Sequence, residues 1–451
     1  MIKEQVCPFL ESVIRLADNF YLFLFYVNIS ITFVYGWWYG IWSFYEKQTM
    51  KAKLFLSVIF LTMLFSACEK AEEPENVAGN QEYSIVNDET LLNGSIQLIN
   101  EPINFKGAKV VAPFSLIASV QSPVVGGVKL SATSVFVKNN KAYVTYAERG
   151  EGYKGALNVL NLSNPATPVL ISQVTFSSID LNASDLSGNV LYLAGSSKKL
   201  GAVVIPVQLN GANGTVVNGA NNCIPTKVGN AASANGVIQG GNWLYVSTGS
   251  TNGGTYCLKK SNLDFVASDL YNGAIYAAAN GRSNGNTQLT LESGVNSNLH
   301  VYKIGLSDEN SEKVIPVGEI KHQNVEPQYA YSGKSTIFMK AGDNVCYVSK
   351  GMYGMEAYNV VSGQMVFKSP LNMLTLGNTN AVSADNNYVY MANGADGVAF
   401  AEYPPSGNIL NIVGVWDDPA YPGSANYVTS DGTYLFVAKG QEGGLKIIKR
   451  N

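Results

Sequence analysis

A repeat along residues 109–451 constrains the fold more than any other feature of the sequence. Its marker is an apolar–aromatic–apolar triplet followed by a small or glycine-containing turn. The middle residues of the triplets are Tyr143, Tyr192, Tyr245, Thr290, Tyr347, Tyr390 and Phe436. Successive markers lie 49, 53, 45, 57, 43 and 46 residues apart, close to the period of a four-stranded propeller blade. The spacing predicts an all-β fold, a seven-bladed β-propeller. Six or eight blades stay open, because the fourth unit, around Thr290, is degenerate.

A second signal keeps register with the first. Asparagine stands ten residues before the marker in five of the seven units, at Asn182, Asn235, Asn280, Asn380 and Asn426. The first strand of each unit is expected to line a central channel. An asparagine there can bind the hydroxyl groups of a ligand or satisfy a local turn. Its recurrence in most units favours the structural role.

Alternating apolar and polar residues place the strands of the first unit. They are expected at residues 133–138, 141–147, 155–162 and 168–175. The last unit stops after its third strand, at residues 444–448, and residues 113–120 resemble the fourth strands of other units. The sequence therefore predicts a ring closed by an N-terminal strand, which leaves few free sheet edges.

The connection between the third and fourth strands of the first unit carries a family resemblance. Residues 157–170, LNVLNLSNPATPVL, lead a strand into a Ser-Asn-Pro-Ala-Thr-Pro turn before the outer strand. This stretch resembles the LVIVD repeat of β-propeller surface lipoproteins of Gram-negative bacteria. Other units keep the strands but replace the turn, as at residues 403–407. The resemblance implies the propeller fold and no particular activity.

Two hydrophobic segments precede the repeat. Residues 20–45 are long and apolar enough to span a bilayer. Residues 50–68 have a basic start, an apolar core and small residues before Cys68. They resemble a bacterial lipoprotein signal peptide in which Cys68 becomes the lipidated first residue. Because two such segments in succession are mechanically awkward, we expect translation to start at Met50 and residues 1–49 to be a mis-assigned upstream extension. A transmembrane helix at residues 20–45 is the alternative.

Residues 69–108 are expected to form a tether and lead-in to a propeller at residues 109–451. The stretch EKAEEPE directly after Cys68 has nothing to bury. Acidic residues at this place resemble the surface-export signal of some Gram-negative lipoproteins, and an ordinary solvated linker is the alternative. The expected location is the outer membrane, with a lipid anchor and exposure at the cell surface.

Composition argues against several functions. The net charge is −3 and no basic stripe is present, so no nucleic acid partner is expected. His300 and His322 are the only histidines, and no nucleophile, phosphate-loop or zinc motif occurs, so we expect no metal site, no cofactor and no histidine-based triad. Cys223, Cys257 and Cys346 are expected to be buried free thiols, with a Cys223–Cys257 disulfide as the alternative.

Candidate ligand-binding residues lie where the turns after the marker strands meet the starts of the first strands. A mixed set of charged, aromatic and amide side chains there can bind a sugar or a peptide. The candidates are Arg149, Glu151, Tyr153, Asn280, Arg282, Tyr353, Asn380, Asp396 and Asn426. For any one of them, a solvated rim of loops is the simpler interpretation. Arg282 needs a charged partner if it is buried near the channel.

Tether, propeller and missing catalytic motifs together predict a lipid-anchored protein that binds a protein or a carbohydrate at the cell surface. No catalytic residue is assigned. The alternatives are a propeller enzyme of the lyase or hydrolase type acting on an extracellular polysaccharide, and a structural subunit of a surface assembly. Converging charged residues with a shifted carboxylate at the channel mouth would favour the enzyme.

Overall fold

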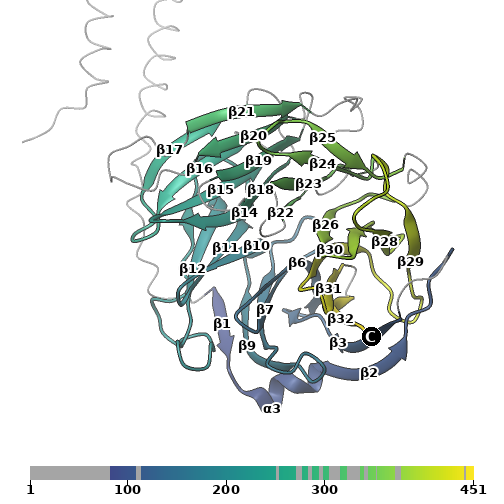
Figure 1. Ribbon diagram of the computed structural model, residues 1–451. Helices are drawn as coiled ribbons and strands as arrows, with labels where there is room; N and C mark the ends of the chain where they lie inside the picture. The colour runs from purple at the N-terminus through teal and green to yellow at the C-terminus, as the bar shows by residue number, and fades with distance from the viewer. Residues whose placement is uncertain are drawn as a thin grey trace, which may run out of the picture. The chain divides into compact units, whose positions relative to one another are not determined.

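The alternating runs of the repeat form antiparallel strands in a computed structural model (Figure 1). The structure describes residues 82–107, 113–249, 253–270, 277–282, 287–293, 298–303, 315–321, 336–339, 344–351, 353–370, 377–440 and 443–451. All of them belong to one unit, residues 78–451. The segments 20–45 and 50–68, with Cys68, lie outside the described residues. Within the part that is described, no helix is both long and apolar enough to cross a membrane.

Seven of the described sheets have four or five strands, and we number them 1 to 7 in the chain order of their innermost strands. Sheet 1 contains β6 (Ser131–Lys138), β7 (Lys141–Ala147), β8 (Gly155–Asn161), β9 (Val169–Phe176) and, outside β9, β1 (Tyr83–Val86). Sheet 2 contains β10 (Ile179–Ser187), β11 (Val190–Ser197), β12 (Gly201–Gln208) and β13 (Thr226–Lys227). Sheet 3 contains β14 (Ser233–Gly240), β15 (Trp243–Gly249), β16 (Gly254–Lys259) and β17 (Phe265–Leu270).

Sheet 4 contains β18 (Ala277–Arg282), β19 (Thr287–Ser293), β20 (Asn298–Lys303) and β21 (Ile315–Lys321). Sheet 5 contains β22 (Ile337–Met339), β23 (Val345–Ser349), β24 (Met355–Asn359) and β25 (Met365–Lys368). Sheet 6 contains β26 (Ala381–Ala384), β27 (Tyr388–Ala392), β28 (Val398–Glu402) and β29 (Ile412–Trp416). Sheet 7 contains β30 (Ala425–Ser430), β31 (Tyr434–Lys439), β32 (Gly444–Arg450), β3 (Phe114–Val120) and β2 (Ile96–Pro102).

The innermost strands contact one another in a closed series. The order is β6, β10, β14, β18, β22, β26, β30 and back to β6. This arrangement confirms the predicted all-β propeller. The strands of sheet 1 also agree with the expected ranges to within two residues, because tight turns and regular alternation bound them on both sides.

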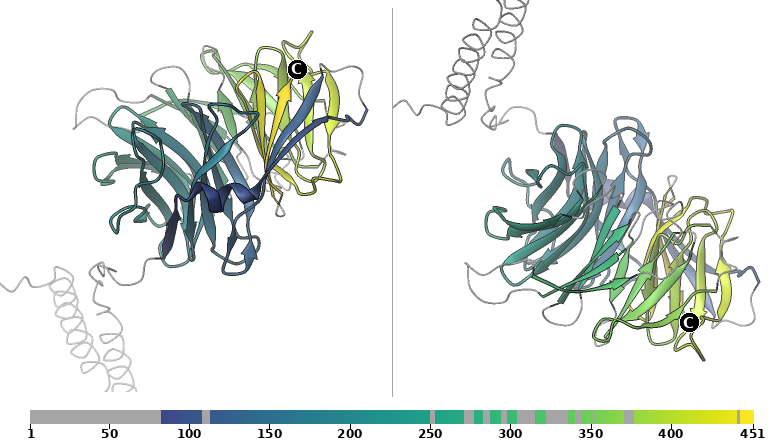
Figure 2. Two further views of the ribbon diagram at one scale, coloured as in Figure 1. Left: turned by 90° about the horizontal axis from the view of Figure 1, so that it is seen from below. Right: turned by 90° about the horizontal axis from the view of Figure 1, so that it is seen from above.

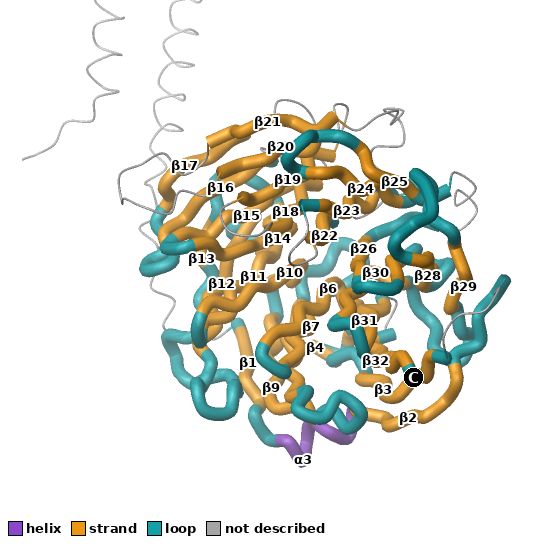
Figure 3. The backbone as a smooth tube through the Cα atoms, in the orientation of Figure 1, coloured by secondary structure: helices purple, strands orange, loops and turns teal. Residues whose placement is uncertain are grey.

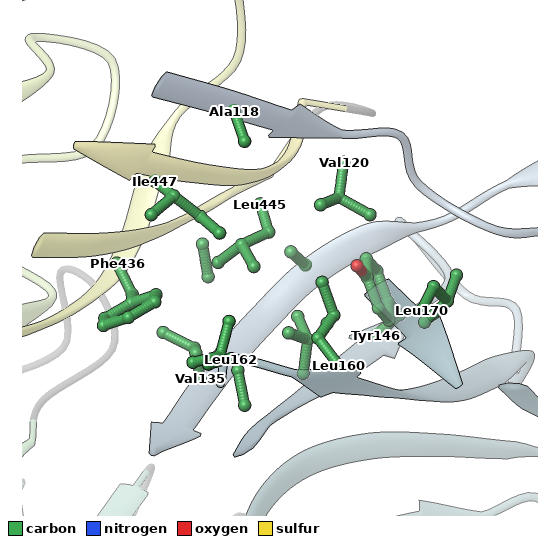
Figure 4. Packing of buried hydrophobic residues seen from close by; sticks show 14 of the residues in the cluster. Ala118, Val120, Val135, Tyr146, Leu160, Leu162, Leu170, Phe436, Leu445 and Ile447 are labelled. Carbon is green, nitrogen blue, oxygen red and sulfur yellow. The ribbon is translucent and has the colours of Figure 1, made fainter. Parts of the chain in front are cut away.

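An N-terminal strand closes the ring, as predicted. β3 pairs antiparallel with β32, so that Ala118 lies opposite Ile447 and Val120 opposite Leu445. Behind this pairing, a core cluster joins sheet 7 to sheet 1 (Figure 4). Phe436 of β31 is fully buried in it. Burial of this apolar surface holds the first and last repeat units together.

The lead-in adds two edge strands that the alternation of apolar and polar residues did not predict. β1 pairs with β9 of sheet 1 and β2 pairs with β3 of sheet 7. Between them the short helix α3 (Glu89–Leu92) crosses from one sheet to the other (Figure 2). The chain then bridges to sheet 6 through Lys106 and Val415. Residues 83–106, expected to be tether and lead-in, thus cover the outer edges of three sheets.

Candidate functional site

Antiparallel order brings the candidates in the turns after the second strands, Arg149, Glu151, Tyr153, Tyr353 and Asp396, to one face of the ring. The turn after the second strand of each sheet lies at the same end as the connection that enters the first strand. We call this end the loop face. It includes the turns 148–154 and 393–397 and the connection 417–424. A small hairpin, β4 (Val124–Val125) and β5 (Val128–Lys129), belongs to it as well (Figure 3).

An ion pair and a neighbouring carboxyl group lie on the loop face between sheets 1 and 2. Lys154 Nζ lies 3.2 Å from Glu148 Oε1, and the two side chains are 28% and 15% exposed. The backbone N–H of Glu148 donates to Oδ1 of Asp180 at 3.0 Å. Asp180 is the second residue of β10, an innermost strand. We call Glu148, Lys154 and Asp180 the mouth cluster, because they lie on the loop face beside the start of the innermost strand β10.

The mouth cluster contains a carboxyl group that titrates near neutral pH. Burial raises the pKa of Asp180 to about 7. The negative charge of Glu148 raises this pKa as well, whereas the hydrogen bond from the Glu148 N–H lowers it. A group of this kind can exchange a proton with a bound ligand at physiological pH.

Glycines let the turn of the mouth cluster fold tightly. Gly150 has φ of +95°, which favours glycine. A Cβ at Gly152 would lie 2.0 Å from the carboxyl carbon of Glu148, so the carboxylate occupies the space that a side chain would need. A Cβ at Gly126, in the β4–β5 hairpin, would lie 3.5 Å from Lys154 Cε. The hairpin therefore packs beside Lys154.

The predicted residues of the same turn surround the cluster. Arg149 and Glu151 are exposed, and Tyr153 is half-buried. Within the described part of the chain, the side chains of Arg149 and Glu151 have no hydrogen bond or ion pair. They are free to contact a ligand that approaches the mouth cluster.

Three of the repeated asparagines, Asn182, Asn380 and Asn426, join neighbouring sheets through their side-chain amides. Asn182, Asn235 and Asn426 are the extra residues of β-bulges in the innermost strands, and Thr133 holds that place in sheet 1. Asn426 Nδ2 donates to the carbonyl of Ala132 at 2.8 Å.

The other bonds have the same pattern, each reaching the carbonyl that precedes the equivalent residue of the next sheet. They run from Thr133 to Leu181 (2.7 Å), from Asn182 to Ala234 (2.9 Å) and from Asn380 to Ala425 (3.1 Å). We call Thr133, Asn182, Asn380 and Asn426 the collar. Its bonds support the structural role of these asparagines.

The remaining candidates are not part of the mouth cluster. Asn280 and Arg282 lie in β18, where Asn280 pairs with Thr290 without a bulge, and their side chains are outside the described part. Tyr353 is half-buried in the turn between β23 and β24. Asp396 lines a separate cavity beside Lys106 and Asp417.

Sequence reasoning missed Glu148 and Asp180 of the mouth cluster and a pair of buried lysines, whereas Lys154 stands in the turn 148–154 that was expected to contribute to the site. The sequence did set Asp180 apart. Other units have serine two residues before the asparagine, at Ser233 and Ser424, whereas this unit has an aspartate there.

The two buried lysines are Lys439 and Lys446, which are only 1% and 5% exposed.

The buried lysines are bound to the protein's own oxygen atoms. Lys439 Nζ donates to the Tyr421 carbonyl. Lys446 Nζ donates to Ser119 Oγ at 2.6 Å and to the Gly443 carbonyl at 2.7 Å. Burial, together with the positive charges of Lys439 and Lys129, lowers the pKa of Lys446 to about 8. Because their donors are used to hold loops, we assign these lysines a structural role.

No metal site emerges from the residues that can be described. Among them, no group of three or more histidine, cysteine, aspartate or glutamate side chains could hold a metal ion. Cys223, Cys257 and Cys346 are buried free thiols, as expected, and the alternative Cys223–Cys257 disulfide is not formed. Burial raises the pKa of Cys223 to about 12 and that of Cys346 to about 12, which makes both thiols unreactive.

Comparison with known proteins gives similarity of shape alone. No family model matches the chain, and no curated protein matches it. The WD40 beta propeller domain of Doa1 has a TM-score of 0.49 and 10% identity, covering 73% of this chain and 97% of that one. U3-55K has a TM-score of 0.47 and 10% identity, covering 73% of this chain and 98% of that one. The fold assignment therefore rests on the strand pairing, and the LVIVD likeness stays a resemblance.

Proposed function

We propose that the protein is a lipid-anchored β-propeller of the outer membrane, exposed at the cell surface, that binds a carbohydrate or protein ligand at the mouth cluster. The signal-like segment 50–68 ending at Cys68 supports the anchor. The observation that carries the binding role is the ion pair of Glu148 and Lys154 on the loop face, joined to Asp180 through the hydrogen bond from the Glu148 backbone N–H.

The mouth cluster is suited to a polar ligand. It offers two carboxylates and one ammonium group that are partly shielded from water, where hydrogen bonds to ligand hydroxyl or amide groups gain strength. The exposed side chains of Arg149 and Glu151 flank it and can adapt to the ligand. By contrast, the collar amides below are already bonded to backbone carbonyls, so they contribute rigidity.

A binding screen tests this proposal. The chain from residue 69 onward is passed over glycan and peptide arrays, and any ligand found is then measured with variants. Asp180→Asn and Lys154→Met should each weaken binding by about tenfold, the loss of one charged hydrogen bond. Glu402→Gln, at an exposed position at the end of β28, is the matched control and should bind normally. If no glycan and no peptide binds, the result counts heavily against the proposal. A ligand whose affinity is unchanged in both Asp180→Asn and Lys154→Met would count against it equally.

A second candidate function follows from the pKa of Asp180. A carboxyl group that titrates near 7 is matched to general acid–base chemistry, so a lyase or hydrolase acting on an extracellular polysaccharide is the alternative. If it is correct, the polysaccharides that bind will be cleaved, and Asp180→Asn will keep binding but lose product formation. Binding without cleavage in the native protein would eliminate the enzyme and leave the binding role intact.

A further inference from the structure

A cavity lies at the outer edge of sheet 6, away from the mouth cluster. Its volume is about 350 Å³. The polar lining consists of Lys106, Asp396 and Asp417, and Ile412 and Val415 form an apolar floor. The volume is in the range of small-ligand sites, which combine an apolar surface with a few polar groups.

The lead-in builds one wall of this cavity. Lys106 N–H donates to the Val415 carbonyl at 2.8 Å, and Val415 N–H donates back to the Lys106 carbonyl at 3.2 Å. The Phe105 ring packs edge-on against Phe400 with centroids 4.9 Å apart. A Cβ at Gly414 would lie 3.0 Å from the Phe105 ring, so the lead-in fits closely on β29. The wall is thus fixed by backbone bonds and by aromatic packing.

The charges of the cavity do not balance. Lys106 Nζ lies 2.7 Å from Asp417 Oδ2, so this ammonium group is already paired. The carboxylate of Asp396 has no hydrogen bond or ion pair with any side chain or backbone group in the described residues. Burial raises the pKa of Asp396, the charge of Asp417 raises it too, and Lys106 lowers it. Within the described residues, Asp396 is therefore a partly exposed carboxylate with no ion pair of its own, beside the apolar residues Ile412 and Val415.

We propose that this cavity binds a primary alkylammonium group, with Asp396 as its counter-ion. The ammonium group donates to the Asp396 carboxylate, and the adjoining methylene groups lie on Ile412 and Val415. An anionic ligand is disfavoured, because the only ammonium group of the lining is held by Asp417. A neutral alcohol of the same length would leave the Asp396 charge unpaired. This site is independent of the function proposed for the mouth cluster.

Lys106 sets the affinity of the cavity. Its ammonium group repels an incoming cation and neutralises Asp417, which would otherwise attract the ligand. Removing this charge frees a second carboxylate. Lys106→Met should therefore bind the amine more tightly than the native chain, whereas Asp396→Asn should bind it more weakly. Opposite changes from two neighbouring substitutions are not expected of nonspecific binding to an acidic surface.

Isothermal titration of the full-length chain tests the site. The probes are n-pentylammonium and Nα-acetyl-lysine amide, which distinguish a free amine from a peptide side chain, with n-pentanol as the neutral control. We expect a dissociation constant of about 1 mM for at least one amine, a loss of about tenfold in Asp396→Asn, and a gain of about threefold in Lys106→Met. The pentanol should not bind.

A control variant and a folding check accompany the titration. Glu402→Gln, also in sheet 6, is the matched control and should leave the affinity unchanged. Thermal unfolding of each variant shows whether it is folded, and the gain expected in Lys106→Met cannot arise from misfolding. No heat from either amine, equal binding by Asp396→Asn, or equal binding of pentanol would each overturn the proposal.

Discussion

The collar makes a quantitative prediction at Asn426, which joins the last innermost strand to the first. Asn426→Ala removes the hydrogen bond to the Ala132 carbonyl, 2.8 Å long, and the one that Oδ1 accepts from Ser424, also 2.8 Å long. Ala132 is fully buried, so its carbonyl loses the bond without gaining water. An unsatisfied buried acceptor costs about 1–3 kcal/mol, and we expect a loss of about 2 kcal/mol in the free energy of unfolding.

The corresponding change in Tm is small but measurable. With an unfolding entropy of about 2.1 cal/mol/K per residue, a unit of residues 78–451 loses about 3 °C. Differential scanning calorimetry and urea unfolding both measure it. Asn408→Ala is the matched control, because Asn408 is exposed and its side chain makes no bond in the described structure; it should change stability by less than about 0.5 kcal/mol.

Two further variants test the reasoning at this position. Asn426→Asp keeps the size but replaces the donor with a carboxylate facing a carbonyl, so it should destabilise more than alanine does. Asn426→Thr should recover part of the loss, because Thr133 makes the equivalent bond in sheet 1 at 2.7 Å. If alanine costs no more at residue 426 than at residue 408, the collar does not hold the ring together and this reasoning is refuted.

Three other predictions concern glycine, pH and thiols. Gly444 has φ of +72°, and a Cβ there would lie 2.0 Å from the Val120 carbonyl, whereas the space at Gly188, with φ of +58°, is open. Gly444→Ala should therefore lower the free energy of unfolding, measured in urea, by at least about 2 kcal/mol, and Gly188→Ala should lower it by about 1 kcal/mol. Equal losses in the two variants would contradict the closure geometry. The pKa of Asp180 in the folded protein, about 7, exceeds the ordinary aspartate value of 3.8, so the native chain should lose stability as the pH rises from about 4 to about 7, while Asp180→Asn should not. Parallel Tm curves for the two would rule this out. A thiol reagent should find the three propeller cysteines unreactive in the native state and reactive in denaturant, since all are buried and free; rapid native labelling would show that the sheets open.

The sequence predicted most of the ring because its strands are bounded by local signals. Residues 141–147 were expected as a strand and form β7, since alternation and turn residues act within a few positions of each other. The asparagine offset predicted a repeated structural feature, which is a β-bulge at Asn182, Asn235 and Asn426. The acceptors of the Asn182 and Asn380 amides lie 52 and 45 residues away and that of Asn426 lies 294 residues away, so they could not be read from the offset alone.

The parts that the sequence did not predict depend on long-range neighbours. β1 (YSIV) and β2 (IQLINEP) lie before the repeat and pair with the outer edges of sheets 1 and 7, and no local pattern specifies such a partner. Lys446 stands in the alternating run GLKIIKR, where a lysine is expected to face water. It is buried because the connection 417–424 covers it, with Tyr421 5.5 Å from its ammonium group.

The lead-in gives the propeller a defined order of mechanical failure. Any force that arrives from the N-terminal side, as the proposed lipid anchor would transmit, loads β1 first. Its four residue pairs with β9, beginning at Tyr83, must separate before the load reaches β2. The closing strand β3 comes after both in the chain. Under tension, the two edge strands should therefore detach before the closing strand β3 is pulled, so that the ring stays closed.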